Sequence, residues 1–156
     1  MRVHLITVGT RMPGWVNTAF NEYAGRLRAP MQLKLTEIPM TRRGKGVDTG
    51  RAKAEEGKRS LQAVPDSANV IALDERGRSW STRDLAQQMR QWQQDGDPVA
   101  LMVGGPDGLA PAVLERARSR WSLSALTLPH AMVRVVVAEQ IYRASSLLNN
   151  HPYHRD

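Results

Sequence analysis

Residues 98–108 read PVALMVGGPDG, and they contain the clearest signal of the fold class. The run from Pro98 to Val103 is short and apolar, which is typical of a buried strand, and a glycine turn at 104–108 follows it directly. A helical pattern then covers about residues 110–119. A strand, a glycine turn and a helix in immediate succession predict one βα unit of a parallel sheet.

The same alternation continues in both directions from this unit. Strands are predicted at 2–8, 31–38 and 69–73, helices at about 13–28, 51–63 and 82–95, and a glycine-rich loop at 39–50. Thr82 is the expected cap of its helix, which ends before Gly96. Residues 121–128 favour a fifth strand or an extended loop.

The last segment, residues 131–150, contains β-branched residues that favour a strand, but its spacing favours a helix. One face repeats with a period of 3.6 residues and holds Val133, Val136, Val137, Gln140, Ile141, Ala144, Leu147 and Leu148. The prediction is therefore a single α/β domain over residues 1–156, with a mainly parallel sheet flanked by helices.

Composition excludes several classes of protein. The 156 residues include no cysteine, which excludes disulfides, thiolate metal sites and a cysteine nucleophile. The longest apolar runs, such as Val99–Val103, are far shorter than the roughly 20 residues of a membrane helix. No secretory signal pattern follows Met1, so the expected location is the cytoplasm, without a membrane partner.

The positive charge is concentrated in the first part of the chain. Residues 1–64 hold 12 Lys/Arg and 5 Asp/Glu, and residues 65–156 hold 10 of each, so the net charge of +7 lies entirely in the first segment. This asymmetry favours a nucleic-acid partner, with a solvated basic face as the alternative. The loop residues Arg42, Arg43 and Lys45 are the expected contacts to RNA phosphates.

Ligands of parallel α/β sheets bind beyond the carboxyl ends of the strands, which directs attention to Gly9 and Thr10, to Leu73 and Asp74, and to the glycine turn. The turn lacks both the GxxxxGK[ST] and the GxGxxG spacing, so it is not a usual phosphate or dinucleotide loop. Residues 123–128 (LSALTL) suit the wall of a flat, neutral heterocycle. The alternatives are an ordinary tight turn and an interior strand.

The end of the chain is dense in titratable groups. Glu139 and Arg143 lie four residues apart, a spacing that also suits a surface ion pair. Residues 149–156 (NNHPYHRD) follow on the same helix, and this density favours a site over a frayed end. His151 and His154 have a spacing that metal ligands use, but no third ligand accompanies them, so no metal is expected.

Several motifs in order resemble one known family. They are VGT at 8–10, ALDERG at 72–77, GGPDG at 104–108, WSLSALTLPHAMVRVVVAEQIYRA at 121–144 and NHPYHRD at 150–156. Over its full length the chain resembles the ribosomal RNA large subunit methyltransferase H family, which are knotted SPOUT-class enzymes dependent on S-adenosylmethionine. Asp107 stands where the family often has Glu.

The resemblance implies methyl transfer to N3 of a pseudouridine in large-subunit ribosomal RNA (23S), on the assembled ribosome. It also implies a homodimer and a C-terminal trefoil knot. The cofactor S-adenosylmethionine would be held by Leu73, Gly104, Gly105, Leu123, Ser124, Ala125, Leu126, Thr127 and Leu128.

Methylation of a base nitrogen requires loss of its proton and creates negative charge on the flanking carbonyls. Glu139 or His154 could accept the proton, and Arg143 or Arg155 could stabilise the charge or hold a phosphate. Tyr153 offers a ring on which a base can stack. Two other functions stay open: a non-catalytic RNA-binding protein that uses residues 1–64, and a small-molecule methyltransferase, which leaves the basic excess unexplained.

Overall fold

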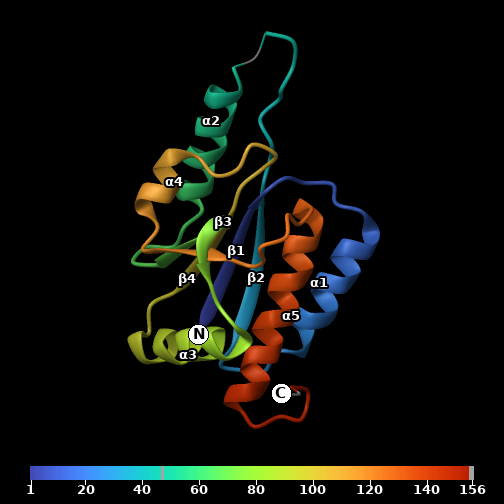
Figure 1. The fold of residues 1–156 in the computed structure, drawn as a ribbon, viewed down its shortest axis with the longest axis vertical. Helices are drawn as coiled ribbons and strands as arrows, with labels where there is room; N and C mark the ends of the chain where they lie inside the picture. The colour runs from blue at the N-terminus through green and yellow to red at the C-terminus, as the bar shows by residue number, and fades with distance from the viewer. Residues whose placement is uncertain (47, 155–156) are drawn as a thin grey trace.

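The computed structural model describes residues 1–46 and 48–154 (Figure 1). Strands and helices alternate along the chain, as the sequence predicts. The strands are β1 (Arg2–Val8), β2 (Gln32–Ile38), β3 (Asn69–Ser79), β4 (Val99–Val103) and β5 (Ser119–Ser122); the helices are α1 (Gly14–Arg26), α2 (Thr49–Gln62), α3 (Thr82–Asp95), α4 (Pro111–Arg116) and α5 (His130–Leu148).

The strands form one sheet in the order β2-β1-β4-β3-β5, and every pairing is parallel. The predicted fold class is therefore confirmed. Strand β3 is longer than the predicted 69–73, because it continues to Ser79 and pairs again with β5 after a register shift between Leu73 and Arg78. The shift moves the side chains of 74–77 out of the regular ladder.

Two apolar clusters place the sheet between two layers of helices. The first joins α1, α3 and α5 to one face and contains Leu5, Leu101 and Ile141. The second joins α2 and α4 to the other face and contains Ile6 and Met102. Alternate residues of each strand therefore enter opposite clusters, which is why both β1 and β4 are apolar on both faces. Figure 1 shows the two layers on either side of the sheet.

Local signals fix the ends of the helices, with one correction to the prediction. Ser81, not Thr82, caps α3, because its side chain accepts from Asp84 N and the Asp84 carboxylate accepts from Ser81 N. Gly96 ends this helix at φ +78°. Residues 123–129 form a loop after the short strand β5, so only the start of 121–128 is a strand.

The order of the strands reverses direction between β1 and β4. These strands are neighbours, but the helices that follow them, α1 and α4, pack on opposite faces of the sheet. This topology favours a ligand site near the glycine turn. The pocket of the structure uses the β4 side of this position, and Gly9 does not line it. The C-terminal knot stays a prediction. Within the described part of the chain, no helix has the length and hydropathy that crossing a membrane requires.

Candidate active site

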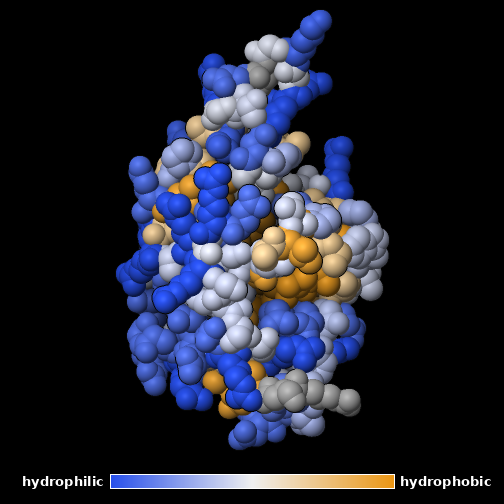
Figure 2. Space-filling view, viewed as in Figure 1, coloured by the Kyte–Doolittle hydropathy of each residue, from blue (hydrophilic) through white to orange (hydrophobic). Residues whose placement is uncertain are grey.

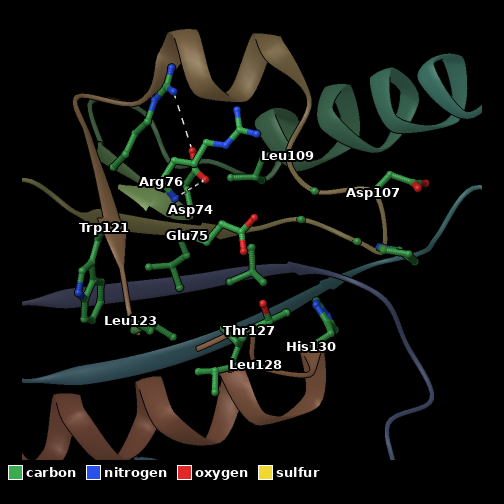
Figure 3. A pocket seen from close by; sticks show the side chains of 18 of the residues that line it. Asp74, Glu75, Arg76, Asp107, Leu109, Trp121, Leu123, Thr127, Leu128 and His130 are labelled. Carbon is green, nitrogen blue, oxygen red and sulfur yellow. Dashed lines mark hydrogen bonds and ion pairs between the residues drawn. The ribbon is translucent and has the colours of Figure 1, made fainter. Parts of the chain in front are cut away.

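A pocket of about 750 Å³ lies beyond the carboxyl end of β4 and beside the middle of β3, where the β3–β5 register shifts (Figure 3). Its wall combines this part of β3, the glycine turn, the loop after β5 and the first turn of α5. Eight of the nine residues expected to hold the cofactor line it: Leu73, Gly104, Gly105, Leu123, Ser124, Leu126, Thr127 and Leu128. Ala125 is the exception, and it is exposed.

The glycine turn is closed on itself. Gly108 N donates to Gly105 O at 3.0 Å, and Gly108 has φ +83°. A Cβ atom on Gly104 would lie 2.7 Å from Leu109 N, which is closer than real Cβ atoms approach backbone. Glycine at 104 therefore allows the turn itself to close, in addition to leaving room for a ligand.

The loop after β5 is held by its own hydroxyl groups. Ser124 Oγ accepts from Leu126 N at 2.9 Å, and Ser122 Oγ donates to Ser124 O at 3.1 Å. Leu126 is 74% exposed. The apolar side chains of Leu123 and Leu128 from the same loop line the pocket, where Figure 3 shows them.

Charged residues in the middle of β3 also line the pocket. Asp74 was among the positions that the sequence singled out, whereas Glu75 and Arg76 were not predicted to line a site. Asp74, Glu75 and Arg76 follow Leu73 where the β3–β5 register shifts. Asp74 Oδ1 accepts from Arg76 N at 3.0 Å, and its Oδ2 lies 3.9 Å from Arg120 Nη1 (Figure 3). The quoted motif ALDERG contained the signal, since a run of charge directly after an apolar run marks the point where the buried part of a strand ends.

His130, at the start of α5, lies between the ends of β1 and β4. Its Nε2 would be 3.4 Å from a Cβ atom on Gly9, and this buried nitrogen has no hydrogen-bond partner among the described residues. Burial, and then the charge of Arg134, lower the pKa of His130 below its usual value. The imidazole at the base of the pocket is therefore neutral at pH 7.

Arg134 is a fully buried cation that the sequence analysis did not single out. It has 0% exposure, and its Nη1 lies 2.7 Å from Glu37 Oε2. Its Nη2 donates to Gly9 O at 2.8 Å. Because a buried charge needs a partner, these bonds fix α5 against the ends of β1 and β2. The only sequence signal was an arginine within the apolar first half of the last helix.

A second buried ion pair connects the basic loop to the pocket. Arg43 donates to both carboxylate oxygens of Glu56, at 2.5 and 2.8 Å, and through Nε to Asp107 Oδ2 at 2.6 Å. Thr41 N also donates to Glu56, at 2.8 Å. Burial raises the pKa of Glu56, but these hydrogen bonds outweigh it and leave the pKa below its ordinary value. Arg43 is thus engaged inside the chain, while Arg42 and Lys45 are exposed.

The terminal residues form a cluster on α5 and the turn after it. Arg143 donates to Glu139 at 2.8 Å, and its guanidinium carbon lies 4.9 Å from the centre of the Tyr153 ring. Tyr153 OH donates to the same carboxylate at 3.1 Å. Burial, and then Glu139, raise the pKa of Tyr153 to about 12. His154 Nδ1 lies 3.4 Å from Ser146 Oγ, and Arg155 lies outside the described residues.

This cluster and the pocket are separate within one chain. None of the described cluster residues lines the pocket. The pocket reaches α5 at His130 and Val133, whereas Glu139 is nine residues beyond His130, about 13 Å along the helix axis. The described residues contain no group of three or more His, Asp or Glu side chains that could hold a metal ion.

Comparison with known proteins identifies the class. The family model described as "Predicted SPOUT methyltransferase" matches residues 1–154, and the chain belongs to this family. Full-length relatives of the chain point to one group within this family. The chain is 57% identical over 155 residues to a protein of Alkalilimnicola ehrlichii and 54% identical over 156 residues to one of Thioalkalivibrio sulfidiphilus, covering at least 99% of both chains each time. Both relatives are named "Ribosomal RNA large subunit methyltransferase H", so the resemblance seen in the motifs is confirmed.

Solved structures confirm the fold at lower identity. A probable methylase family protein from Haemophilus influenzae superposes with a TM-score of 0.56 at 18% identity, over 99% of this chain and 70% of that chain. A putative methyltransferase from Legionella pneumophila, described as bound to the cofactor SAM, gives a TM-score of 0.50 at 11% identity, over 93% of this chain and 66% of that chain.

Proposed function

We propose that this chain transfers a methyl group from S-adenosylmethionine to N3 of a pseudouridine in large-subunit ribosomal RNA, acting on the assembled ribosome in the cytoplasm. One observation carries the proposal. The residues that the family resemblance assigns to the cofactor converge from β3, β4 and the loop after β5 on one pocket. Relatives that are more than half identical over the full chain are named for activity on this RNA.

The pocket suits the cofactor in size and chemistry. Its volume of about 750 Å³ falls in the range of small-molecule sites. The glycine turn gives close access to backbone, and Leu73, Leu123 and Leu128 offer flat apolar walls for an adenine ring. When bound, S-adenosylmethionine supplies a methyl group on a positively charged sulfur. The carboxylates of Asp74 and Glu75 line the same pocket and would favour a cation there.

The terminal cluster supplies groups for the base. We assign the proton acceptor to His154, because the Glu139 carboxylate already accepts from Arg143, Tyr153 and Gln140. Glu139 is then a positioning residue that fixes Arg143 and the Tyr153 phenol. Arg143 would stabilise negative charge on the base carbonyls, and the ring of Tyr153 would give the base a surface for stacking. Arg155 remains a candidate second cation.

A homodimer is part of the proposal. Met132, Val135 and Val136 on α5 are only partly buried, and Figure 2 shows an apolar patch over this part of the molecule. Trp15 on the neighbouring helix α1 is 55% exposed. An exposed apolar helix face favours association of two copies of the chain, and most homodimers have twofold symmetry. Pairing through α5 would also bring the terminal cluster of one subunit nearer the pocket of the other.

Binding and sedimentation test this proposal against a non-catalytic RNA-binding function. Calorimetry with S-adenosylmethionine should give saturable binding to the purified protein, and sedimentation should give twice the mass of one chain. Met132→Glu should produce monomers that keep their secondary structure but transfer no methyl groups. A wild-type protein that binds ribosomes but not the cofactor would instead support the non-catalytic function.

A further inference from the structure

We propose that a basic groove between α2 and residues 40–42 binds the phosphate backbone of the RNA; this inference rests on the proposed function. The groove has a volume of about 540 Å³ and lies apart from the cofactor pocket. It is lined by Met40, Thr41, Arg42, Glu55, Lys58, Arg59 and Gln62. None of these residues lines the cofactor pocket, so its function is separable from cofactor binding.

The spacing of the lining residues explains the shape of the groove. Residues 55, 58, 59 and 62 follow the i, i+3, i+4, i+7 pattern and therefore share one face of α2. The opposite wall is the chain leaving β2. Arg59 Nη2 donates to Thr41 Oγ1 and so ties the two walls together. The groove is a fixed part of the fold, because side chains of α2 form hydrogen bonds that hold residues 40–42 in place.

The groove has a net positive charge, and two of its cations are free to bind an anion. Arg42, Lys58 and Arg59 outnumber the one carboxylate, Glu55. Arg42 and Lys58 are exposed and have no ion-pair partner among the described residues. Nearby, Arg43 and Glu56 neutralise each other inside the chain. The phosphate contacts therefore fall to Arg42 and Lys58, with Arg59 beside them, and not to Arg43.

The lining favours a phosphate backbone over other ligands. It contains no aromatic ring on which a base or an adenosine could stack, and Met40 is its single apolar residue. Figure 2 shows the projection formed by α2 and its preceding loop as hydrophilic almost throughout. A protein partner would need apolar anchors, whereas a polyanion needs cations of this kind. Because Arg43 and Thr41 fix the loop, little ordering entropy is lost on binding.

The experiment compares two double variants that remove the same charge. Arg42→Ala with Lys58→Ala changes the groove; Arg90→Ala with Lys34→Ala removes one exposed Arg and one exposed Lys from α3 and β2. Binding to protein-free large-subunit rRNA and to intact large subunits is measured across a range of salt concentrations. Calorimetry with S-adenosylmethionine checks that each variant has kept its fold and its pocket.

We expect the groove variant to lower the salt slope of RNA affinity by about 2 and to weaken binding roughly 10- to 100-fold at about 0.1 M salt. The control variant should change neither quantity appreciably, and cofactor affinity should stay at the wild-type value in both. Equal effects of the two variants would overturn the groove assignment. So would a loss confined to intact subunits, because that result points to a ribosomal protein. If the wild-type protein bound neither the protein-free rRNA nor the intact large subunits, that result would instead overturn the proposed function.

Discussion

The guanidinium of Arg43 and the buried carboxylate of Glu56 form a two-bond ion pair, with N–O distances of 2.5 and 2.8 Å. Glu56 is 2% exposed, and its Oε1 would lie 3.5 Å from a Cβ atom on Gly105. Arg43 reaches the same turn through Asp107. The pair thus fixes the glycine turn of the cofactor pocket to α2 and to the basic loop.

Replacing Glu56 by Gln should destabilise the protein by about 3 kcal/mol, because it leaves the Arg43 charge without its buried partner. It should also weaken S-adenosylmethionine binding severalfold, since the turn at Gly105 and Asp107 loses its support. Urea unfolding measures the first effect and calorimetry the second. Glu55→Gln, one residue earlier on the exposed face of α2, is the matched control and should change neither. Equal effects of the two substitutions would contradict a special role for the Arg43–Glu56 pair.

Gly104→Ala should weaken cofactor binding at least tenfold. The new Cβ would lie 2.7 Å from Leu109 N, so the backbone of the turn must move. Gly25→Ala in α1, where no atom lies within 4 Å of the added group, serves as the control. It should leave cofactor affinity unchanged and stabilise the helix by about 0.5–1 kcal/mol. If Gly104→Ala bound S-adenosylmethionine with wild-type affinity, the turn would tolerate a side chain at position 104, and the close approach to Leu109 N would not constrain the pocket.

Stability should fall as the pH drops from 7 toward 5, in part because of His130. The unfolded chain takes up a proton near the ordinary histidine value of 6.5, whereas burial keeps the folded pKa lower. The unfolded state therefore binds more protons in this window, and acid favours unfolding. His130→Gln should flatten the profile, and His4, whose pKa is also lowered by burial, should contribute to the slope that remains. Urea midpoints between pH 5 and 8 give both curves, and identical slopes would refute the assignment.

Removing residues 153–156 should leave cofactor affinity near the wild-type value but abolish methyl transfer. Tyr153 contacts Tyr142 at a ring distance of 4.4 Å, so a loss of about 1 kcal/mol in stability is expected as well. Tyr153→Phe keeps the ring over Arg143 and should retain more activity than Tyr153→Ala. Single-turnover assays on ribosomes measure the rates. A truncated protein with the wild-type rate would remove the terminal cluster from the active site.

The sequence predicted the parallel sheet well, because buried strands and amphipathic helices leave strong periodic signals. Eight of the nine residues expected to hold the cofactor line the pocket. They could be predicted because the apolar runs of β3 and β4 are easy to recognise in the sequence, and ligand-binding residues follow such runs. The pairing of Arg43 with Glu56, and of Arg134 with Glu37, could not be predicted. Each pair forms only when the folded chain brings the two side chains into contact. The partners are 13 residues apart in the first pair and 97 residues apart in the second. For that reason the sequence predicted Arg43 as a contact to RNA phosphates and not as the partner of a buried carboxylate.

Methyl transfer to ribosomes that lack the modification measures the proposed activity itself. The purified protein is incubated with methyl-labelled S-adenosylmethionine and ribosomes from a strain without the gene, and the digested rRNA is analysed by mass. The proposal predicts one label per large subunit, on N3 of a pseudouridine, with assembled ribosomes preferred over free rRNA. Absence of transfer, or a label on another atom or another RNA, would contradict it.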